Sequence, residues 1–207
     1  MYLVEQRFEL VMPMDGNDAL KKIELCGRTC YKSESSITDD SARKFVKMII
    51  DRGHESVLEH VSVTVRIICD RGVSHELVRH RLCAFSQEST RYCDYSKEKH
   101  GSEIAFIMPP DMSPAEEKIW RRSVTRAEKD YMEMTKAGSK PQIARSLLPN
   151  ALKTEIVTTA NVRQWRHMFN LRTHKAAHPQ MREVMVPLLA FMQRAFPVLF
   201  DDIEVVD

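Results

Sequence analysis

The chain has 207 residues, of which 43% are hydrophobic and 29% are charged, as in an ordinary globular protein. Its length fits one domain over residues 1–207, or one main domain with a smaller helical lobe. Its 31 lysines and arginines nearly balance 29 acidic residues, so the overall charge favours neither a nucleic acid nor a membrane surface as a partner. No apolar run approaches the roughly 18 residues that span a membrane, and the first residues do not resemble a signal peptide.

Five cysteines are scattered along the chain without a CxxC pair. An odd, scattered set predicts reduced thiols and a cytoplasmic location rather than a disulfide framework. Cys26 and Cys30 have the spacing of one helical face, but two ligands alone make a weak metal site. We therefore expect no bound metal.

In the first half of the chain, apolar periodicity, glycines and prolines predict five elements. In order they are a strand over 2–12, a helix over 17–30, a helix over 38–51, a strand over 61–69 and a short helix over 74–81. Thr38 and Ser74 are the expected N-caps of the second and third helices, and Gly53 fits the end of the second.

The second half of the chain alternates strands with longer helices. It is predicted to contain a strand over 104–108, a long helix over 114–136, a short helix over 141–148, a strand over 151–160 and helices over 161–171 and 179–195. Ser113 is the expected N-cap of the long helix and Pro114 its first residue. The alternation of helices and strands predicts an α+β fold.

Residues 79–92, RHRLCAFSQESTRY, are the most informative stretch of the sequence. Arg79, His80, Arg81 and Arg91 lie close in sequence to amide and hydroxyl side chains, and few of these residues belong in a core. Guanidinium groups and hydrogen-bonding side chains at this density suit an anionic ligand such as a nucleotide.

The segment HESVLEH (54–60) suggests a zinc site at first sight. His54 and His60 are six residues apart, which places two imidazoles roughly 240° apart around a helix instead of on one face. The segment is therefore interpreted as a helix end or loop in which histidine and glutamate make ordinary hydrogen bonds.

A second polar cluster spans residues 161–178. Arg163 and His167 are four residues apart and share a helical face. Surface arginines are usually solvated, so a solvated basic face is the alternative interpretation. Trp165 and Phe169 must fill the opposite side of this helix, which leaves one polar face.

Nucleophilic catalysis would need an activated cysteine or serine beside a base. Cys83 and Ser89 lie near His80 in sequence, but no G-x-S-x-G turn is present. The chain has only six glycines and contains no glycine-rich phosphate loop or dinucleotide fingerprint. Arginines and histidines must therefore hold the phosphates of any nucleotide or flavin.

The run Arg79-His80-Arg81, seven residues, Ser89 and then Arg91-Tyr92 resembles the signature of the flavin-dependent thymidylate synthases. Further segments resemble other parts of the family in the same order, and the likeness covers nearly the whole chain. These segments are HESVLEH (54–60), ARSLLP (144–149), NVRQWRHMFNLR (161–172) and AHPQMR (177–182).

The resemblance implies an antiparallel or mixed sheet flanked by long helices, in a homotetramer with active sites at subunit interfaces. It implies reductive methylation of dUMP to dTMP without a protein nucleophile. Methylenetetrahydrofolate would be the carbon donor, and FAD reduced by NADPH would be the hydride source. The folate-binding residues are not identified by the resemblance.

The resemblance also assigns roles to individual residues. Flavin contacts would come from Ser56, Arg79, His80, Arg81, Gln87, Asn161, Arg163 and His167. Contacts with dUMP would come from Glu76, Arg79, Gln87, Glu88, Ser89, Thr90, Arg91, Arg145 and Arg172. Arg172 is the expected catalytic residue, because its guanidinium would stabilise the anion at uracil N3 and O2 as C5 becomes nucleophilic.

The sequence departs from the commoner family pattern at a few positions. Ala84, Ser86 and Gln87 stand where serine, asparagine and glutamate are more common, and Glu76 stands where many members have glutamine. Gln87 lacks the charge of a glutamate, and a carboxylate at position 76 can accept a hydrogen bond but cannot donate one. These changes affect individual contacts with the nucleotide.

Two other functions fit parts of the sequence. A nucleic-acid-binding module could place residues 79–81 and the arginines of 163–172 on phosphates, and it would need a continuous basic surface. The balanced charge disfavours this function. A non-catalytic flavoprotein of the same fold would bind FAD without forming dTMP.

Overall fold

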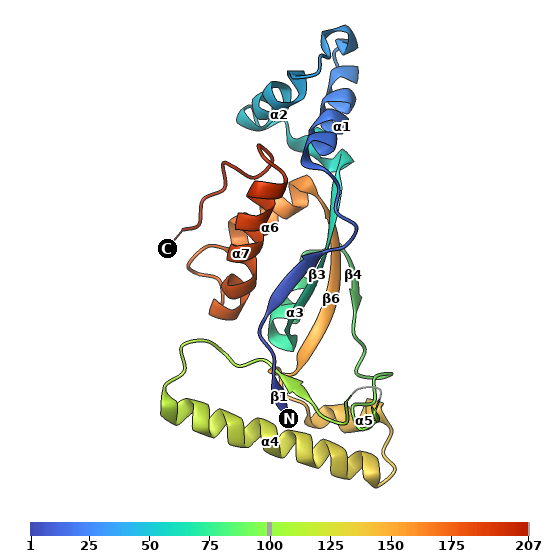
Figure 1. The fold of residues 1–207 in the computed structure, drawn as a ribbon, viewed down its shortest axis with the longest axis vertical. Coiled ribbons are helices and arrows are strands. Elements are labelled where there is room, and N and C mark those ends of the chain that lie inside the picture. Colours follow the sequence, from blue (N-terminus) through green and yellow to red (C-terminus); the bar gives the residue numbers. More distant parts are fainter. Residues whose placement is uncertain (99–100, 207) are drawn as a thin grey trace. The chain divides into compact units, whose positions relative to one another are not determined.

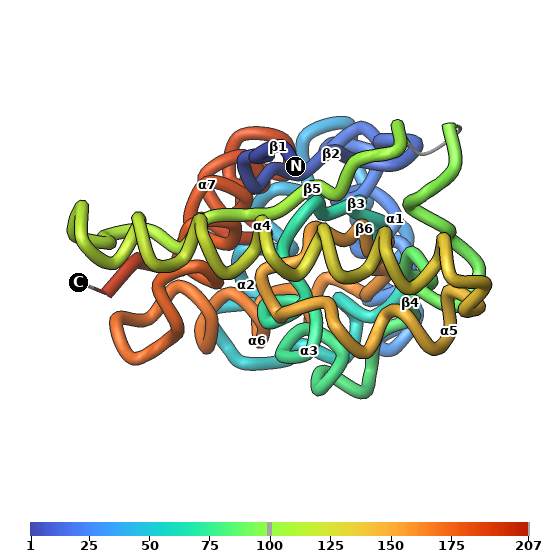
Figure 2. Tube along the Cα trace, turned by 90° about the horizontal axis from the view of Figure 1, so that it is seen from below, coloured from blue at the N-terminus to red at the C-terminus, as the bar shows by residue number. Residues whose placement is uncertain are grey.

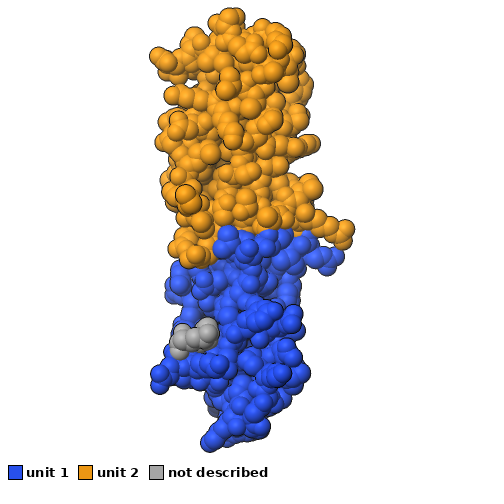
Figure 3. Space-filling view, turned by 90° about the vertical axis from the view of Figure 1, so that its right-hand side faces the viewer, with its two compact units in different colours: residues 1–7, 67–79, 85–157 blue, residues 8–66, 80–84, 158–207 orange. Residues whose placement is uncertain are grey.

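The computed structural model describes residues 1–98 and 101–206 and has the predicted α+β architecture. It contains two compact units, which Figure 3 distinguishes by colour. Unit 1 comprises residues 1–7, 67–79 and 85–157, and unit 2 comprises residues 8–66, 80–84 and 158–207. Within the described ranges, no helix is long and apolar enough to cross a membrane.

Strands contribute to a four-stranded sheet and to a two-stranded parallel pair. The sheet has the order β2-β3-β6-β4, formed by Arg7–Leu10, Ser62–Asp70, Lys153–Asn161 and Ala84–Gln87. In β6, side chains alternate between buried and half-buried over the whole strand, as expected for a period of two residues. The parallel pair joins β1 (Tyr2–Leu3) to β5 (Ala105–Phe106) in unit 1.

The N-terminal part of unit 2 contains two packed helices, α1 (Gly16–Thr29) and α2 (Ser41–Asp51), which Figure 1 shows near each other. Asp15 caps α1 by accepting hydrogen bonds from two backbone N–H groups of the first turn. A Cβ at Gly27 would lie 2.7 Å from the Phe45 ring. The absence of a side chain at position 27 therefore lets the two helices approach closely.

The C-terminal part of unit 2 is built on α6 (Val162–Arg172) and α7 (Pro179–Ala195), which lie side by side. Trp165 and Phe169 on α6 are fully buried and stack with ring centroids 5.7 Å apart. The indole Nε1 of Trp165 donates a hydrogen bond of 3.0 Å to the carbonyl of Val63 on β3. This contact fixes the rotation of α6 over the sheet.

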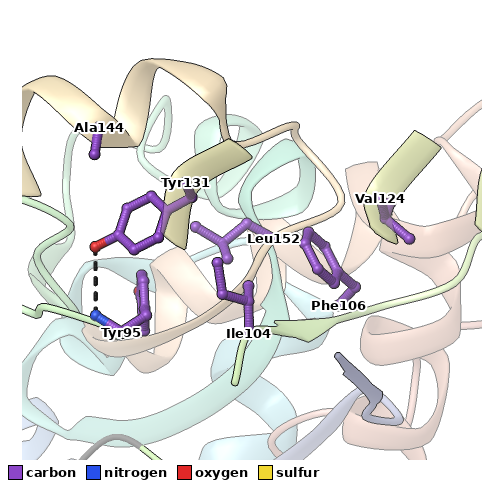
Figure 4. Close-up of a cluster of buried hydrophobic side chains, with 7 residues drawn as sticks. All are labelled: Tyr95, Ile104, Phe106, Val124, Tyr131, Ala144 and Leu152. Carbon is purple, nitrogen blue, oxygen red and sulfur yellow. Dashed lines mark hydrogen bonds between the residues drawn. The ribbon is translucent and has the colours of Figure 1, made fainter. Parts of the chain in front are cut away.

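Unit 1 contains α3 (Arg71–Leu77), α4 (Pro114–Lys136), α5 (Pro141–Ala144) and the short 3-10 helix η4 (Arg145–Leu147). The long helix α4 runs beside β5 and α5 (Figures 1 and 2). Its Val124 and Tyr131 pack in a hydrophobic cluster with Phe106 and Leu152, as Figure 4 shows. Buried apolar area of this kind is the main stabilising contribution to such a unit.

Most predicted elements are confirmed, including helix α4 with Ser113 as its N-cap and Pro114 as its first residue. Gly53 has the positive φ of 68° that suits the end of α2. The predicted 2–12 strand was wrong in extent, because it consists of the two short strands β1 and β2. The 104–108 strand is confirmed only over Ala105–Phe106.

Two predicted N-caps were wrong. The N-cap of α2 is Asp40, and Thr38 instead donates its backbone N–H to the Ser41 hydroxyl. Asp70 caps α3 through a 2.7 Å bond from the Val73 N–H, which places Ser74 inside the helix. Since α3 ends at Leu77, the basic residues 79–81 lie beyond it, and the strand β4 that follows them was not predicted.

The capping box of α4 provides a test of stability in unit 1. Ser113 accepts from the Glu116 N–H, and the Glu116 carboxylate accepts in return from the Ser113 N–H at 2.8 Å. We expect Ser113→Ala to lower the free energy of unfolding by about 1 kcal/mol, because backbone N–H groups of the first turn lose their partner. Urea denaturation measures this change. Ser123→Ala, at an exposed position within the same helix, is the control and should be neutral or slightly stabilising.

Candidate functional site

Helix α6 presents polar side chains on one face of unit 2. Its N-cap is Asn161, whose Oδ1 accepts from the Gln164 N–H at 2.8 Å. Because Trp165 and Phe169 are buried, Arg163 and His167 are directed outward and are exposed. The two side chains share the outer face of the helix, as the spacing of four residues predicted.

A hollow of about 630 Å³ opens over this face of α6. This volume lies within the range of small-molecule and cofactor sites. Three of the expected flavin contacts line the hollow. The lining residues are Glu55, Glu59, Leu82, Asn161, Arg163, Gln164, Arg166, His167 and Asn170.

Both carboxylates of the hollow are paired with arginines of α6. Glu59 accepts from Arg163 Nη1 at 2.7 Å, and Glu55 accepts from Arg166 Nε at 3.4 Å. The two glutamates belong to the 3-10 helix η2 (Glu55–His60). Most of the segment HESVLEH thus forms a short 3-10 helix of its own, which corrects its interpretation as a helix end or loop. The predicted hydrogen bonds of its glutamates are confirmed, and they pair with cations of α6.

Whereas Arg163 is exposed, Arg166 is buried and bound to the C-terminal segment. It is 6% exposed and donates from Nη1 and Nη2 to the two carboxylate oxygens of Asp202, each at 2.6 Å. Its Nη1 also donates to the carbonyl of Leu199. The hydrogen bonds from Arg166 lower the pKa of the Asp202 carboxyl. This arginine therefore ties the C-terminal segment to α6, and the basic run of α6 divides into buried and exposed cations.

His80 and Arg172 are in direct contact in unit 2. Arg172 Nε donates to His80 Nε2 at 3.0 Å, and the His80 ring packs edge-on against His167 with centroids 6.1 Å apart. A guanidinium can only donate, so His80 accepts through an unprotonated Nε2. The expected catalytic arginine and two expected flavin contacts are thus brought together.

The environment of His80 keeps its imidazole neutral. The residue is 6% exposed, and burial together with the charge of Arg172 and the neighbouring His167 lowers the pKa of His80 to about 4. A protonated imidazole would have no acceptor for Arg172 and would add a second positive charge. Ser56 and Arg81 are exposed and do not line the hollow, although Glu55 and Leu82 beside them do.

In unit 1, two of the expected dUMP contacts meet at a smaller cavity of about 430 Å³. Arg145 Nη1 donates to the hydroxyl of the buried Thr90 at 3.3 Å. A second guanidinium and further polar groups complete the cavity. The lining residues are Arg71, Thr90, Gln142, Arg145, Ser146, Leu148 and Leu152. Two guanidinium groups and a hydroxyl suit an anionic group such as a phosphate.

Gln87 and Glu88 are held by internal hydrogen bonds. The Gln87 amide nitrogen donates to the hydroxyls of Ser74 and Thr154, at 2.9 and 3.2 Å. The Glu88 carboxylate accepts from the Tyr95 hydroxyl at 2.9 Å and from Lys153 Nζ at 3.2 Å. The hydrogen bonds of these two side chains hold residues 87 and 88 against other parts of unit 1.

The other expected contacts in unit 1 have local partners. The Ser89 hydroxyl accepts from the Arg91 N–H at 3.3 Å, and the Arg91 guanidinium lies 5.4 Å from the centroid of the Tyr92 ring. The Glu76 carbonyl on α3 accepts from the Arg79 N–H.

Several lining residues were not assigned from the sequence. Asn170 belongs to the predicted polar cluster of residues 161–178 but was given no role, although its spacing with Arg163 and His167 places it on the same face of α6. Ser146 adjoins Arg145 within ARSLLP. Arg71 gave no local signal, because it reaches the cavity from the start of α3, about 70 residues before Gln142 and Ser146. Among residues 1–98 and 101–206, no group of three or more histidine, cysteine, aspartate or glutamate side chains could hold a metal ion.

Comparisons with known proteins identify the family of the chain. A family profile described as thymidylate synthase complementing protein matches residues 9–198. The flavin-dependent thymidylate synthase of Mycobacterium avium (strain 104) is 34% identical over 211 residues, covering 92% of this chain and 81% of that protein. The protein of the same name from Pyrococcus abyssi (strain GE5 / Orsay) is 34% identical over 161 residues, covering 76% and 65%.

A solved structure shares the fold. It is a UMP/dUMP methylase, PolB, from Streptomyces cacaoi bound with 5-Br dUMP, with a TM-score of 0.76 and 24% identity, covering 97% of this chain and 96% of that chain. The fold and the matched profile place the protein in the class of thymidylate synthase complementing proteins. The chain belongs to the flavin-dependent thymidylate synthase family.

The His80 environment makes a prediction about pH. We expect the His80 imidazole to titrate near pH 4. Because the pKa of an unfolded histidine is about 6.5, the unfolded chain binds more protons between these values, so His80 makes the free energy of unfolding fall as the pH falls from about 6.5 to 4. Histidine proton resonances in NMR, with His80 assigned through a His80→Gln variant, measure the titration. A His80 midpoint near 6.5 would contradict the described environment.

Proposed function

We propose that this protein is the flavin-dependent thymidylate synthase that its family membership indicates, an enzyme that converts dUMP to dTMP. Its carbon donor is methylenetetrahydrofolate, and its flavin is FAD, reduced by NADPH. The observation that carries the proposal is the contact of Arg172 with the neutral His80, which packs against His167 at the hollow over α6. This contact holds a fixed cation next to a cavity of cofactor size.

The hollow in unit 2 is the proposed site of FAD. Arg163 provides a cation for a phosphate, and the amides of Gln164 and Asn170 provide further donors. Asn161 uses its oxygen to cap α6, so its amide nitrogen is the group proposed to contact the flavin. Ser56, Arg79, His80, Arg81, Gln87 and His167 are the other proposed contacts. FAD, when bound and reduced, supplies the hydride of the reaction.

Unit 1 is proposed to hold dUMP. The cavity of Arg145, Arg71 and Thr90 offers two guanidinium groups and a hydroxyl to the phosphate. Glu76, Arg79, Gln87, Ser89 and Arg91 are proposed to contact the rest of the nucleotide. The carboxylate of Glu88 already accepts from Tyr95 and Lys153, so its contribution to this site is proposed to be indirect.

Arg172 is proposed to stabilise negative charge on the uracil ring. As C5 of dUMP becomes nucleophilic, charge develops at N3 and O2, and a guanidinium fixed before the reaction stabilises it without reorganisation. His80 accepts from Nε of this guanidinium and so orients it. We propose that the reaction uses no protein nucleophile. In agreement with this, burial raises the pKa of the Cys83 thiol to about 11 and disfavours its thiolate.

The assembly is also part of the proposal. We propose that residues 1–207 act as one functional domain, because a single family profile matches residues 9–198. The domain would form a homotetramer, in which the contacts of unit 1 and of unit 2 at one active site come from different subunits. A cytoplasmic location is proposed because all five cysteines are free.

The role of Arg172 can be tested by substitution. We expect Arg172→Ala to lower kcat for dTMP formation by at least about 100-fold, the usual effect of losing a preorganised charge-stabilising donor. The flavin absorbance of the purified protein should be retained, because the proposed flavin contacts remain. Arg194→Ala, at an exposed position on α7, is the control and should keep wild-type turnover. Intact turnover in Arg172→Ala would refute the catalytic role, and a colourless wild-type protein that binds no added FAD would refute the function.

The shared active site can be tested by complementation. Arg145→Ala and Arg172→Ala should each be inactive, and subunits from the two variants should form mixed tetramers when co-expressed. Some sites would then combine an intact Arg145 with an intact Arg172, so part of the dTMP-forming activity should return. Two different Arg172 variants, co-expressed in the same way, should gain none. A lack of recovery in tetramers shown to be mixed would contradict a site shared between subunits.

A further inference from the structure

Glu88 lies in the middle of segment 87–91, which the proposed function assigns to dUMP, yet its side chain faces its own unit. Its carboxylate accepts from the Tyr95 hydroxyl at 2.9 Å and from Lys153 Nζ at 3.2 Å. Its backbone N–H donates to the Glu155 carbonyl on β6 at 2.8 Å. The main chain and the side chain of one residue are therefore both fixed.

The segment is held on both faces of strand β6. Lys153 and Glu155 are two residues apart and lie on its half-buried face, whereas Thr154 lies on the buried face. Gln87 donates to the Thr154 hydroxyl, and Glu88 accepts from Lys153, whose Nζ also contacts Glu155 at 2.6 Å. The consecutive side chains of Gln87 and Glu88 are thus hydrogen-bonded to opposite faces of β6.

Tyr95 connects this arrangement to the hydrophobic core of unit 1. Its backbone N–H donates to the Tyr131 hydroxyl at 3.3 Å, as the dashed line in Figure 4 shows, and the two rings lie 6.0 Å apart. Tyr131 belongs to α4 and is fully buried in the cluster with Phe106 and Leu152. The position of the Tyr95 hydroxyl is thereby fixed by packing.

The charge states suit these contacts. Burial, with the neighbouring charge of Glu88, raises the pKa of Tyr95, so its phenol stays protonated and donates. Burial favours a lower pKa for Lys153, but its hydrogen bonds to Glu155 and Glu88 outweigh this effect and leave the pKa raised. Glu88 and Lys153 are each 18% exposed, so water competes little for their contact.

We propose that Tyr95 and Lys153 are positioning residues of the dUMP site, which act through the Glu88 carboxylate to hold segment 87–91 in its binding conformation. The inference rests on the proposed function, since it assumes that this segment contacts dUMP. Glu88 then stabilises the conformation of the segment and does not contact the nucleotide. Ser89, Thr90 and Arg91 follow Glu88 directly, so any loosening at Glu88 would shift their contacts with dUMP.

The first test is Tyr95→Phe, which removes one hydroxyl and keeps the ring that packs on Tyr131. With FAD-loaded protein, we expect the KM for dUMP and its dissociation constant, from calorimetric titration, to rise about tenfold, as for the loss of one hydrogen bond to a charged group. The kcat should change less than twofold, and the flavin spectrum should not change. Ser113→Ala is the matched control, because it weakens α4 in the same unit and should leave the KM unchanged. An unchanged KM in Tyr95→Phe would overturn the inference.

A double-mutant cycle distinguishes positioning from direct contact. Glu88→Leu, which removes the acceptor of the Tyr95 hydroxyl, should raise the KM by at least the same factor. Combined with Tyr95→Phe it should raise the KM little further, because both changes break the same contact. Effects that multiply would mean that Glu88 touches dUMP independently, which overturns the inference.

Lys153 gives an independent check if Tyr95→Phe does not fold. We expect Lys153→Met to raise the KM for dUMP and Lys153→Arg, which keeps the charge, to restore most of the loss. Equal KM values for wild type and Lys153→Met would overturn the role of Lys153. Wild-type protein that binds no dUMP and forms no dTMP would refute the proposed function itself, whereas active wild type with unaffected variants refutes only this inference.

Discussion

The burial of one side of α6 determines the geometry of the whole site in unit 2. Trp165 and Phe169 stack beneath the helix, and the Trp165 indole is hydrogen-bonded to β3. Once this side is fixed, the rotation of the helix about its axis determines the direction in which each polar side chain points. Arg163 and His167 must face the hollow, and Arg166 must enter the interior, where Asp202 compensates its charge. The packing of the apolar side of α6 thus determines that Arg166 is buried and Arg163 is exposed.

Unit 1 orders its polar residues by a different means. Segment 87–91 has little apolar surface of its own, and its conformation depends on hydrogen bonds to α3, β6 and the Tyr95 segment. Hydrogen bonds to charged groups are directional and strong when water is excluded. The apolar cluster around Tyr131 provides the fixed points from which these bonds extend. Apolar packing therefore fixes the side chains whose hydrogen bonds in turn order segment 87–91.

Local signals explain what could be predicted from the sequence. The capping serine and proline of α4, the alternation in β3 and the apolar side of α6 depend on neighbouring residues, and these elements were found. The outer polar face of α6 followed from the spacing of Arg163 and His167. The sequence favours position 38 as the N-cap of α2 because threonine is a common capping residue. The helix begins only at Ser41, and its N-cap Asp40 makes no side-chain capping hydrogen bond, so no capping contact marks its start. Strand β4 was missed because its register depends on β6, which is remote in sequence. The partner of Glu88 on β6, Lys153, and the hydrogen bond from Arg172 to His80 could not be predicted for the same reason, since the interacting residues are remote in sequence.

The bond between His80 and Arg172 also limits how the sequence can drift. It couples two positions that are 92 residues apart in the chain. Lysine or arginine at position 80 would place two cations in contact, while glutamine would keep an acceptor for the guanidinium. Replacement of Arg172 by a neutral residue would in turn leave the buried imidazole without its donor. Accepted changes at these two positions should therefore be correlated during divergence, with each residue setting the substitutions open to the other.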